Sequence, residues 1–373
     1  MVVLKTYVKV LWGILFLSTA VRACTRCGTR PSLPRIINGK EAFPHSWPWM
    51  AYIQFGPGTS CERSCGASLI MNNMVLTAAH CLHTPHSCRY QRQWRANEIC
   101  VSLGVHSRSR RATTAAVVER TVSKVYVINS YKAATFDNDV ALLMLSEPVE
   151  YTNEISPICP VRADTYVPDG TLCKVTGWGV TNFNVLIFSG TTQPSDVLME
   201  ASVRYSSAEA CRASSQYPRD EITDDMLCAA EPATDACSGD SGGPLMCAFT
   251  VSGETQWKQL GIVSFGKGCA RPSYPGVYTD VRKMANWIER TVAFGACGSM
   301  ERLDSKYYVN GPNIETKSGI SERECEEACI YRPNAECKAA TYSQRTSYCW
   351  LLAQPRWTGR RSGWVAFRKR NGC

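Results

Sequence analysis

Long apolar runs are absent from this chain beyond its first 23 residues. A membrane-spanning helix needs about 20 consecutive apolar residues, and no later segment of the 373-residue sequence approaches that length. We therefore expect no stable membrane span. The sequence also lacks any Asn-x-Ser/Thr site, so N-glycosylation is not expected. Histidine is scarce, with five in all, which leaves few candidates for a general base at neutral pH.

Cysteine, by contrast, is abundant. Twenty cysteines predict a disulfide framework made in an oxidising compartment rather than in the cytosol. Residues 1–23 predict the route there, because two lysines precede a short apolar run and small residues precede Cys24, as in a cleaved signal peptide. We expect a secreted, extracellular protein, with an uncleaved anchor as the less favoured alternative. This location argues against a nucleic-acid partner, although the net charge is +9.

The pattern of the sequence changes along the chain, which is longer than one typical domain. Residues 24–35 contain prolines and read as a short propeptide. Residues 36–281 alternate short β-like runs with Gly, Pro, Asn and Asp, which predicts an all-β sandwich or barrel. Residues 281–290 have apolar residues at helical spacing. A short linker at 291–296 and a separate region at 297–373 are expected to follow.

One stretch carries a candidate nucleophile. Residues 235–245 read D-A-C-S-G-D-S-G-G-P-L, with Ser241 surrounded by glycines. Glycine tolerates the backbone angles of a tight, exposed turn. In such a turn the amides of Gly239 and Ser241 can point at one spot and stabilise a developing oxyanion. A serine hydroxyl is a poor nucleophile alone, so a histidine base and a carboxylate must orient and activate it.

The sequence contains a candidate for each partner. His80 ends the apolar segment L-T-A-A-H and precedes a cysteine that can pin it. Asp139, in D-N-D-V-A-L-L, enters an apolar strand where a buried acid can orient imidazole. We interpret Asp137 as a cap or turn residue. The remaining histidines are interpreted as satisfied surface or core residues: His45, His83, His86 and His106.

These motifs, together with R-I-I-N-G at 35–39 and G-W-G at 177–179, resemble the chymotrypsin-fold, trypsin-like serine proteases. The order His, Asp, Ser is also that family's. The resemblance covers about residues 27–293. It implies two six-stranded antiparallel β-barrels with a C-terminal helix and the catalytic residues between the barrels. The implied catalytic residues are His80, Asp139 and Ser241, with the oxyanion hole at Gly239 and Ser241.

The resemblance also implies a zymogen. Cleavage after Arg35 would free the amino group of Ile36, which would then pair with Asp240 beside the nucleophile. A buried carboxylate is costly unless it is paired, so the oxyanion hole should stay misformed until the new ammonium arrives. The expected domains are a signal peptide (1–23), a propeptide (24–35), a protease domain (36–293) and a small C-terminal domain (297–373).

The implied substrate pocket has an acid at its base. Asp235 lies six positions before Ser241, where trypsin-like members carry that acid; the alternative is an ordinary loop charge. A desolvated carboxylate favours binding of an Arg or Lys side chain and disfavours apolar side chains, which would leave the charge unpaired. Ala236 lacks a hydroxyl that could help to solvate a lysine, so Arg is favoured over Lys. The other implied pocket residues are Ser264, Phe265, Gly266 and Gly276, with Phe265 standing where most members carry Trp.

Several cysteine pairs follow from the resemblance alone. They are Cys65–Cys81, Cys173–Cys247, Cys211–Cys228, Cys237–Cys269 and Cys27–Cys159, the last of which would tether the propeptide after activation. Cys24, Cys61, Cys88 and Cys100 are additional, and the sequence does not choose among their three possible pairings. We expect no metal and no cofactor, since Val105 stands where calcium-binding members have a carboxylate. Arg108, Arg110 and Arg111 make the same loop basic; a solvated loop is favoured over an anion-binding exosite.

The region 297–373 contains six cysteines and reads as a disulfide-stapled small domain. A C-x3-C pair in a predicted helix, followed by two strands, resembles a PAN/apple module. That resemblance implies Cys325–Cys349, Cys329–Cys337 and Cys297–Cys373. Such modules bind proteins or carbohydrates. No acidic residue follows Glu336, while basic residues and tryptophans do, so a sulfated-glycan site and a solvated basic tail both remain open.

These observations predict a secreted serine endopeptidase zymogen that cuts proteins or peptides after Arg (and Lys) through an acyl-enzyme. The alternative is a non-catalytic binding protein in which the protease fold serves only as a scaffold. Pseudoproteases usually lose a catalytic residue, and His80, Asp139 and Ser241 are all present. The sequence therefore favours the enzyme.

Overall fold

The computed structural model describes residues 27–31, 40–56, 62–83, 92–180, 194–231, 239–268, 271, 273–297, 301–303, 308–310, 313–322, 325, 329, 337, 339–352, 356–358 and 364–368. The chain divides into two compact units, Met1–Ala285 and Asn286–Cys373. Each is described by itself below.

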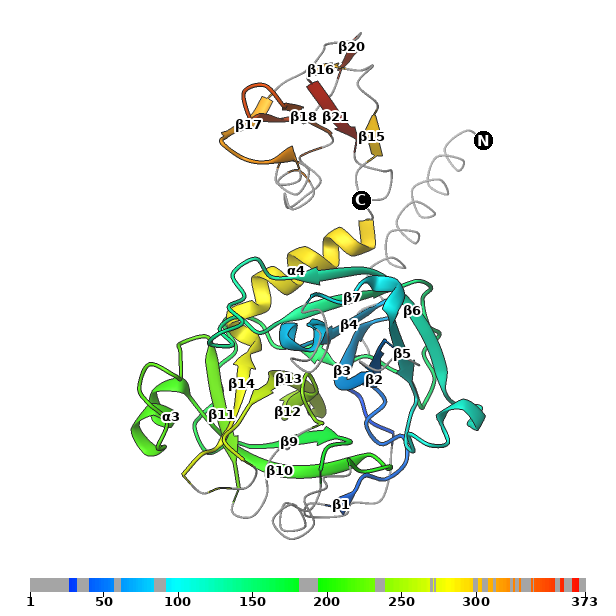
Figure 1. The fold of residues 1–373 in the computed structure, drawn as a ribbon, viewed down its shortest axis with the longest axis vertical. Helices are drawn as coiled ribbons and strands as arrows, with labels where there is room; N and C mark the ends of the chain where they lie inside the picture. The colour runs from blue at the N-terminus through cyan, green and yellow to red at the C-terminus, as the bar shows by residue number, and fades with distance from the viewer. Residues whose placement is uncertain are drawn as a thin grey trace, which may run out of the picture. The chain divides into compact units, whose positions relative to one another are not determined.

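The first half of unit 1 is a closed β-barrel, drawn in blue and cyan in Figure 1. Its strands are β2 (Met50–Phe55), β3 (Arg63–Met71), β4 (Met74–Thr77), β5 (Ile99–Leu103), β6 (Val118–Val127) and β7 (Ala141–Leu145). They close in the order β2-β3-β4-β7-β6-β5 with antiparallel pairings throughout. Every residue of β2 and β4 is buried, as apolar strands covered on both faces should be.

The second half of unit 1 is a second six-stranded ring, drawn in green and yellow. Its strands are β9 (Leu172–Gly177), β10 (Met199–Ser206), β11 (Met226–Ala230), β12 (Pro244–Val251), β13 (Glu254–Phe265) and β14 (Gly276–Asp280). Antiparallel pairings close it as β9-β10-β11-β14-β13-β12-β9. The predicted pair of six-stranded barrels is confirmed. Two short strands join its outside: β1 (Lys40–Glu41) pairs with β10, and β8 (Cys159–Pro160) adds the one parallel pairing among the described strands of unit 1, to β13.

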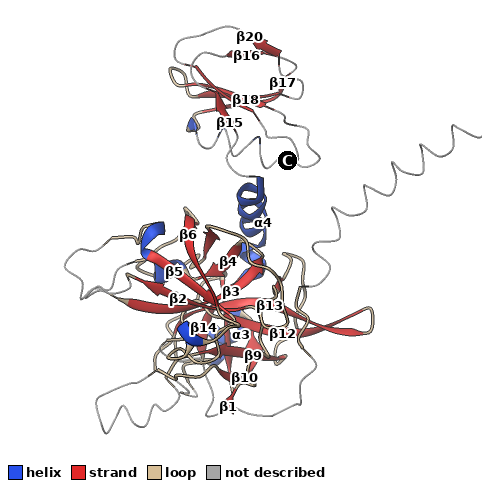
Figure 2. Cartoon of the chain, turned by 90° about the vertical axis from the view of Figure 1, so that its right-hand side faces the viewer, coloured by secondary structure: helices blue, strands red, loops and turns tan. Residues whose placement is uncertain are grey.

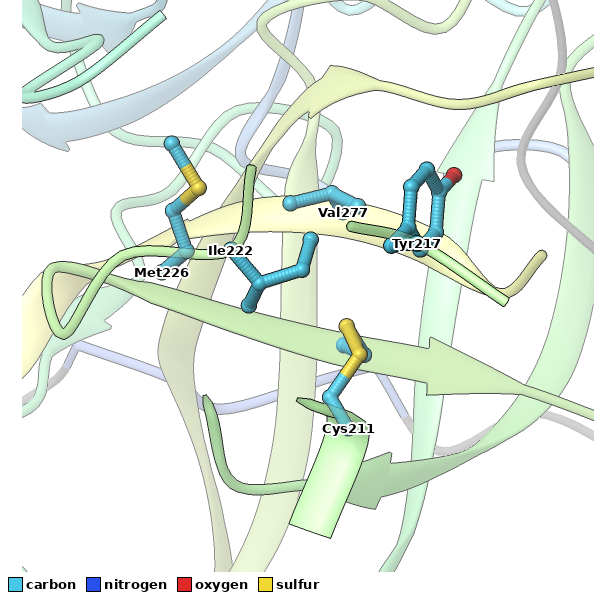
Figure 3. Close-up of a cluster of buried hydrophobic side chains, with 6 residues drawn as sticks. Cys211, Tyr217, Ile222, Met226 and Val277 are labelled. Carbon is cyan, nitrogen blue, oxygen red and sulfur yellow. A yellow bond between two sulfur atoms is a disulfide. The ribbon is translucent and has the colours of Figure 1, made fainter. Parts of the chain in front are cut away.

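A buried cluster supports the second barrel beside the helix α3 (Ala208–Ser214). It comprises Cys211, Tyr217, Ile222, Met226, Cys228 and Val277 (Figure 3). Phe265 and Tyr274 pack against it. The Cys211–Cys228 disulfide ties α3 to β11 inside this cluster. The cluster therefore supports Phe265 and Tyr274, which also belong to a group of aromatic residues near the candidate site.

Three further disulfides of unit 1 join segments that the resemblance pairs. They are Cys65–Cys81, Cys173–Cys247 and Cys27–Cys159. Cys100 forms no disulfide among the described residues. Cys24, Cys61, Cys88, Cys237 and Cys269 lie outside the described residues.

The helix predicted over residues 281–290 is present but longer than expected. It is α4, Val281–Cys297, which follows β14 in the sequence and is drawn in blue in Figure 2. The helix thus runs through residues 291–296, the expected linker. That stretch contains no proline, and a single glycine in a helix costs only about 1 kcal/mol, so nothing in the sequence ends the helix before Cys297. No helix in the described part of the chain is both long and apolar enough to cross a membrane.

Unit 2 is built on a five-stranded antiparallel sheet in the order β15-β21-β18-β19-β17. Its strands are β15 (Glu301–Leu303), β17 (Asn313–Ser318), β18 (Ala339–Ser343), β19 (Tyr348–Leu352) and β21 (Trp364–Arg368), while β16 (Tyr308–Asn310) pairs with β20 (Arg356–Thr358). Cys325 and Cys329 are helical, and they form the disulfides Cys325–Cys349 and Cys329–Cys337. The expected helix, strand, strand order is therefore present; Cys373, the expected partner of Cys297, lies outside the described residues.

Candidate active site

His80 lies on a short 3-10 helix, Ala79–Leu82, which follows directly from the buried strand β4. The next residue, Cys81, is completely buried and bonded to Cys65 of β3. The histidine is thus fixed from both sides, by a core strand before it and a covalent link after it. Its own side chain remains partly accessible, at 13%, as a group that must meet a substrate requires.

Asp139 binds His80 twice. One carboxylate oxygen, Oδ1, accepts the backbone N–H of His80 at 2.8 Å, and the other lies 2.7 Å from the Nδ1 ring nitrogen. Ser264 of β13 donates its hydroxyl to Oδ2 at 2.5 Å, and Thr279 of β14 donates to the Asp139 carbonyl oxygen at 2.9 Å. The second barrel therefore helps to hold an aspartate that belongs to the first.

The pKa of Asp139 reflects opposing effects. The side chain has no exposed surface, and this burial by itself raises the pKa. Attraction to His80 and the hydrogen bonds from His80 and Ser264 act the other way and prevail, so the pKa of Asp139 lies below its usual value. The carboxylate is therefore ionised at neutral pH and makes Nδ1–H the favoured tautomer of His80, which leaves Nε2 free to accept a proton.

Ser241 lies just before β12, against the elements of the first barrel that carry His80. Its carbonyl oxygen accepts the N–H of Gly66 of β3 at 2.8 Å. The Cys81 sulfur lies 3.7 Å from that same oxygen and 3.8 Å from the His80 Nε2. The Ser241 backbone and the reactive edge of the imidazole therefore contact the same sulfur atom.

Gly242 allows this close approach. Its backbone is in the left-handed region, with φ 79°, and a Cβ there would overlap the Thr77 hydroxyl and the Gly66 carbonyl oxygen. Only glycine meets both conditions without strain. The glycines after the candidate nucleophile are thus explained by the contact between the barrels.

Asp240 explains the G-W-G motif. Its Oδ1 accepts the N–H of Gly179 at 2.8 Å, and a side chain on Gly177 or Gly179 would overlap its carboxylate. The two glycines leave the space into which Asp240 fits. Gly239, the other residue of the expected oxyanion hole, has φ 105°. Arg35 and Ile36 lie outside the described residues, so the expected Ile36–Asp240 pair stays a prediction.

Some of the expected substrate-pocket residues are described by the structure and others are not. Asp235 and Ala236 lie outside the described residues. Ser264 contacts Asp139, as described above, and Gly266 and Gly276 lie at the end of β13 and the start of β14. A Cβ on Gly266 would meet only the Gly268 carbonyl oxygen, at 3.4 Å.

An aromatic row that we did not predict begins beside His80. The ring of Phe136 lies 5.7 Å from the imidazole and 5.5 Å from the ring of Phe265. Phe265 contacts Tyr217 at 6.2 Å, and Tyr217 contacts Tyr274 at 5.2 Å. These four residues, which we call the aromatic row, come from separate segments of the chain. No local sequence pattern brings them together.

A group of potential metal ligands, Cys65, His80 and Cys81, does not suit a metal. Its two cysteines are joined in a disulfide, so neither can supply the thiolate that a metal would need. The imidazole is already bound to Asp139. The chemistry of this donor set therefore fits a catalytic histidine and not a metal centre.

The loop after Val105 is held by protein groups. Asp196 accepts hydrogen bonds from the Ser107 hydroxyl at 2.7 Å and from the Ser109 amide at 2.8 Å. Arg108 donates to the carbonyl oxygens of residues 194 and 195. Arg111 contacts Glu119, and Arg110 is exposed. Two of the three arginines are therefore used within the fold, which favours the interpretation as an ordinary loop.

Two antiparallel six-stranded barrels that place a histidine, bound to a buried aspartate, beside a glycine-flanked serine define a chymotrypsin-fold serine protease. Comparison with known proteins agrees. Residues 36–288 match the family model "Trypsin", and residues 297–363 match the PAN domain. The chain belongs to the trypsin family, the trypsin-like serine endopeptidases, and carries a PAN domain after the protease region.

Two curated relatives each match 72% of this chain. Human "Transmembrane protease serine 5" is 36% identical over 270 residues, which make up 72% of this chain and 54% of the relative. "Clotting factor G beta subunit" from Tachypleus tridentatus is 39% identical over 279 residues, covering 72% of this chain and 83% of the relative. The match thus spans about half of the human protein and most of the other.

Proposed function

We propose that this protein is a secreted serine endopeptidase, made as a zymogen and activated by cleavage after Arg35, that hydrolyses peptide bonds after Arg and, less readily, Lys. The observation that carries the proposal is the His80–Asp139 pair, which is doubly hydrogen-bonded and contacts the Ser241 turn through Cys81. A buried aspartate that orients one ring nitrogen leaves the other to act as a base, as acyl transfer by serine requires.

In the proposed mechanism the Ser241 hydroxyl attacks the scissile carbonyl carbon while Nε2 of His80 takes the hydroxyl proton. The C–N bond then breaks, and His80 returns that proton to the leaving amine. In the second half, a water molecule attacks the acyl carbon while His80 takes a proton from it. The bond to the Ser241 oxygen then breaks, and His80 returns the proton to that oxygen. Asp139 stays ionised, holds the tautomer of His80 and stabilises the imidazolium.

The amides of Gly239 and Ser241 are assigned to the oxyanion. The positive φ of Gly239 supports this assignment, because it allows the sharp turn in which successive amides can converge. Donors of this kind contribute about 3–4 kcal/mol to the transition state. Asp240, packed against the G-W-G turn, is assigned to the Ile36 ammonium that activation would create.

The preference for Arg or Lys is assigned to Asp235, whose carboxylate would pair with the positive charge of the substrate side chain. The aromatic row beside His80 supports a further preference for substrates with an apolar residue before the basic one, since such a side chain would lie against aromatic rings. Phe265 in place of the larger Trp shapes this wall.

Secretion is supported by the disulfides, of which six join described residues, because such bonds persist in oxidising compartments. The PAN domain would bind a protein or a carbohydrate and bring the protease to its site of action. Unit 2 thus serves targeting in this proposal, and unit 1 serves the chemistry.

The test uses the full chain with residues 31–35 replaced by Asp-Asp-Asp-Asp-Lys, so that enteropeptidase cuts before Ile36. Hydrolysis of matched peptide amides ending in Arg, Lys or Ala is measured before and after cleavage. We expect turnover only after cleavage, in the order Arg, Lys, Ala, and none with Ser241→Ala. Absence of Ser241-dependent turnover in the cleaved protein would favour the non-catalytic alternative.

A further inference from the structure

Arg63, which the sequence did not single out, reaches the turn that carries His80. It is the first residue of β3. Its Nη1 lies 3.2 Å from the carbonyl oxygen of His83 and 3.5 Å from that of His80, and its Nη2 lies 3.7 Å from the sulfur of Cys65. The guanidinium therefore spans the end of the catalytic turn and the disulfide that anchors it.

These contacts supply hydrogen-bond donors to carbonyl groups at the end of the turn. The last carbonyl groups of a short helix have no partner inside it, and the Ala79–Leu82 helix ends at His83, whose N–H donates back to the His80 carbonyl at 3.3 Å. A planar guanidinium presents several donors in a fixed fork. Arg63 can therefore satisfy the His83 carbonyl directly and assist the His80 carbonyl, which keeps the turn in one conformation.

Arg63 also brings a positive charge close to the catalytic pair. Burial lowers its pKa, and the nearby Asp139 and Tyr131 counteract this. The groups facing it are thus the Asp139 carboxylate, the Tyr131 phenol and the His80 and His83 carbonyls. Burial raises the pKa of Tyr131 well above its usual value, so Tyr131 is neutral and Arg63 is the fixed cation of this group.

We propose that Arg63 is a positioning residue for the serine protease reaction: it holds the turn that carries His80 in one conformation through its contacts to the His80 and His83 carbonyls and to the Cys65 sulfur. This inference rests on the proposed function. The contacts to the carbonyls fix the ring against Asp139 and toward Ser241.

The experiment compares Arg63→Gln, Arg63→Lys and the control Arg108→Gln with the parent enzyme, all activated before Ile36. Arg108 is a suitable control because it also donates to two backbone carbonyls but lies in another loop. The measurements are kcat and KM for an arginyl peptide amide across pH 5–9, and the melting temperature of each variant.

For Arg63→Gln we expect kcat about 10-fold lower with little change in KM, because displacement of a catalytic group by about 1 Å can reduce the rate as much as 100-fold. Arg63→Lys keeps a donor without the fork, so its kcat should lie between those of the parent and Arg63→Gln, again with little change in KM. Arg108→Gln should change neither kcat nor KM.

Two results would overturn the inference. One is an Arg63→Gln enzyme whose kcat and KM equal those of the parent. The other is an Arg63→Gln enzyme whose KM changes as much as its kcat and whose melting temperature falls, with no recovery of kcat in Arg63→Lys, which would make Arg63 a structural residue only. If Arg63→Gln does not fold, Arg63→Lys decides by its kcat, which must fall below the parent's. A parent enzyme without Ser241-dependent turnover would refute the proposed function itself and is detected before any variant is compared.

Discussion

The two sides of the candidate site are stabilised by different kinds of interaction. On the base side, His80 is held by charge and covalent bonding: a buried carboxylate, a nearby arginine and a disulfide. On the nucleophile side, Ser241 is held by backbone hydrogen bonds and by glycines that let two segments touch. Substitutions on the base side should therefore act mainly through protonation and tautomer, and those on the nucleophile side through steric overlap.

The largest effect is expected on the base side, from Asp139→Asn. An asparagine preserves the shape but favours the wrong tautomer of His80, so kcat should fall about 10,000-fold. Steady-state kinetics of the activated enzyme will measure this. Asp137→Asn, two residues earlier and bonded to Lys132 and Thr223 instead, is the matched control and should retain most of the activity. A small loss with Asp139→Asn would show that the pair does not work as described.

Gly242→Ala tests the nucleophile side. The new methyl group would overlap Thr77 and Gly66 while the backbone has φ 79°. Left-handed strain and overlap together should cost about 2–5 kcal/mol of unfolding free energy, measured by denaturant titration. Gly253→Ala has a similar φ of 84° but nothing within 4 Å, so it isolates the strain. Equal losses in the two variants would mean that steric contact at Gly242 contributes nothing.

The Cys65–Cys81 bond lies where the two sides meet, and its removal should have an intermediate effect. It closes a loop with a sequence separation of 16, for which loop entropy predicts a stabilisation of about 3 kcal/mol. In Cys65→Ala/Cys81→Ala we expect that loss of unfolding free energy, together with lower kcat. Removing Cys173–Cys247, which lies within the second barrel, should destabilise without a specific fall in kcat. Unchanged kcat in the first double variant would contradict the bridging role of Cys81.

Ser264→Ala should have the smallest effect and a characteristic pH dependence. The pKa of Asp139 is lower in the folded protein than in the unfolded chain, so its ionisation stabilises the fold above the unfolded pKa, near 4, and this contribution is lost as pH falls through the folded pKa. Without the Ser264 hydrogen bond that loss should begin at higher pH. At neutral pH we expect Ser264→Ala to lower the free energy of unfolding by about 1 kcal/mol. Denaturant unfolding of parent and variant at pH values from 3 to 7 measures this difference. Parallel stability curves for parent and variant would argue against this role.

The sequence predicted those parts of the site that depend on local patterns. His80, Asp139 and Ser241 lie in short motifs. The all-β class follows from the alternation of short strands and turns, while the two six-stranded barrels were implied by the family resemblance. Arg63 and the aromatic row were missed because their contacts join residues distant in sequence, such as Phe136 and Phe265. The helix expected over 281–290 continues to Cys297, because a single glycine weakens a helix without ending it.

The account as a whole depends on Ser241 acting as a nucleophile, and acyl-enzyme formation tests this most directly. The protein cleaved before Ile36 is mixed with p-nitrophenyl guanidinobenzoate, the nitrophenol burst is measured, and the labelled residue is located by mass spectrometry. The account predicts one acyl group per molecule, on Ser241, and none before cleavage. A cleaved, folded protein that shows no burst, or carries the label elsewhere, would contradict it.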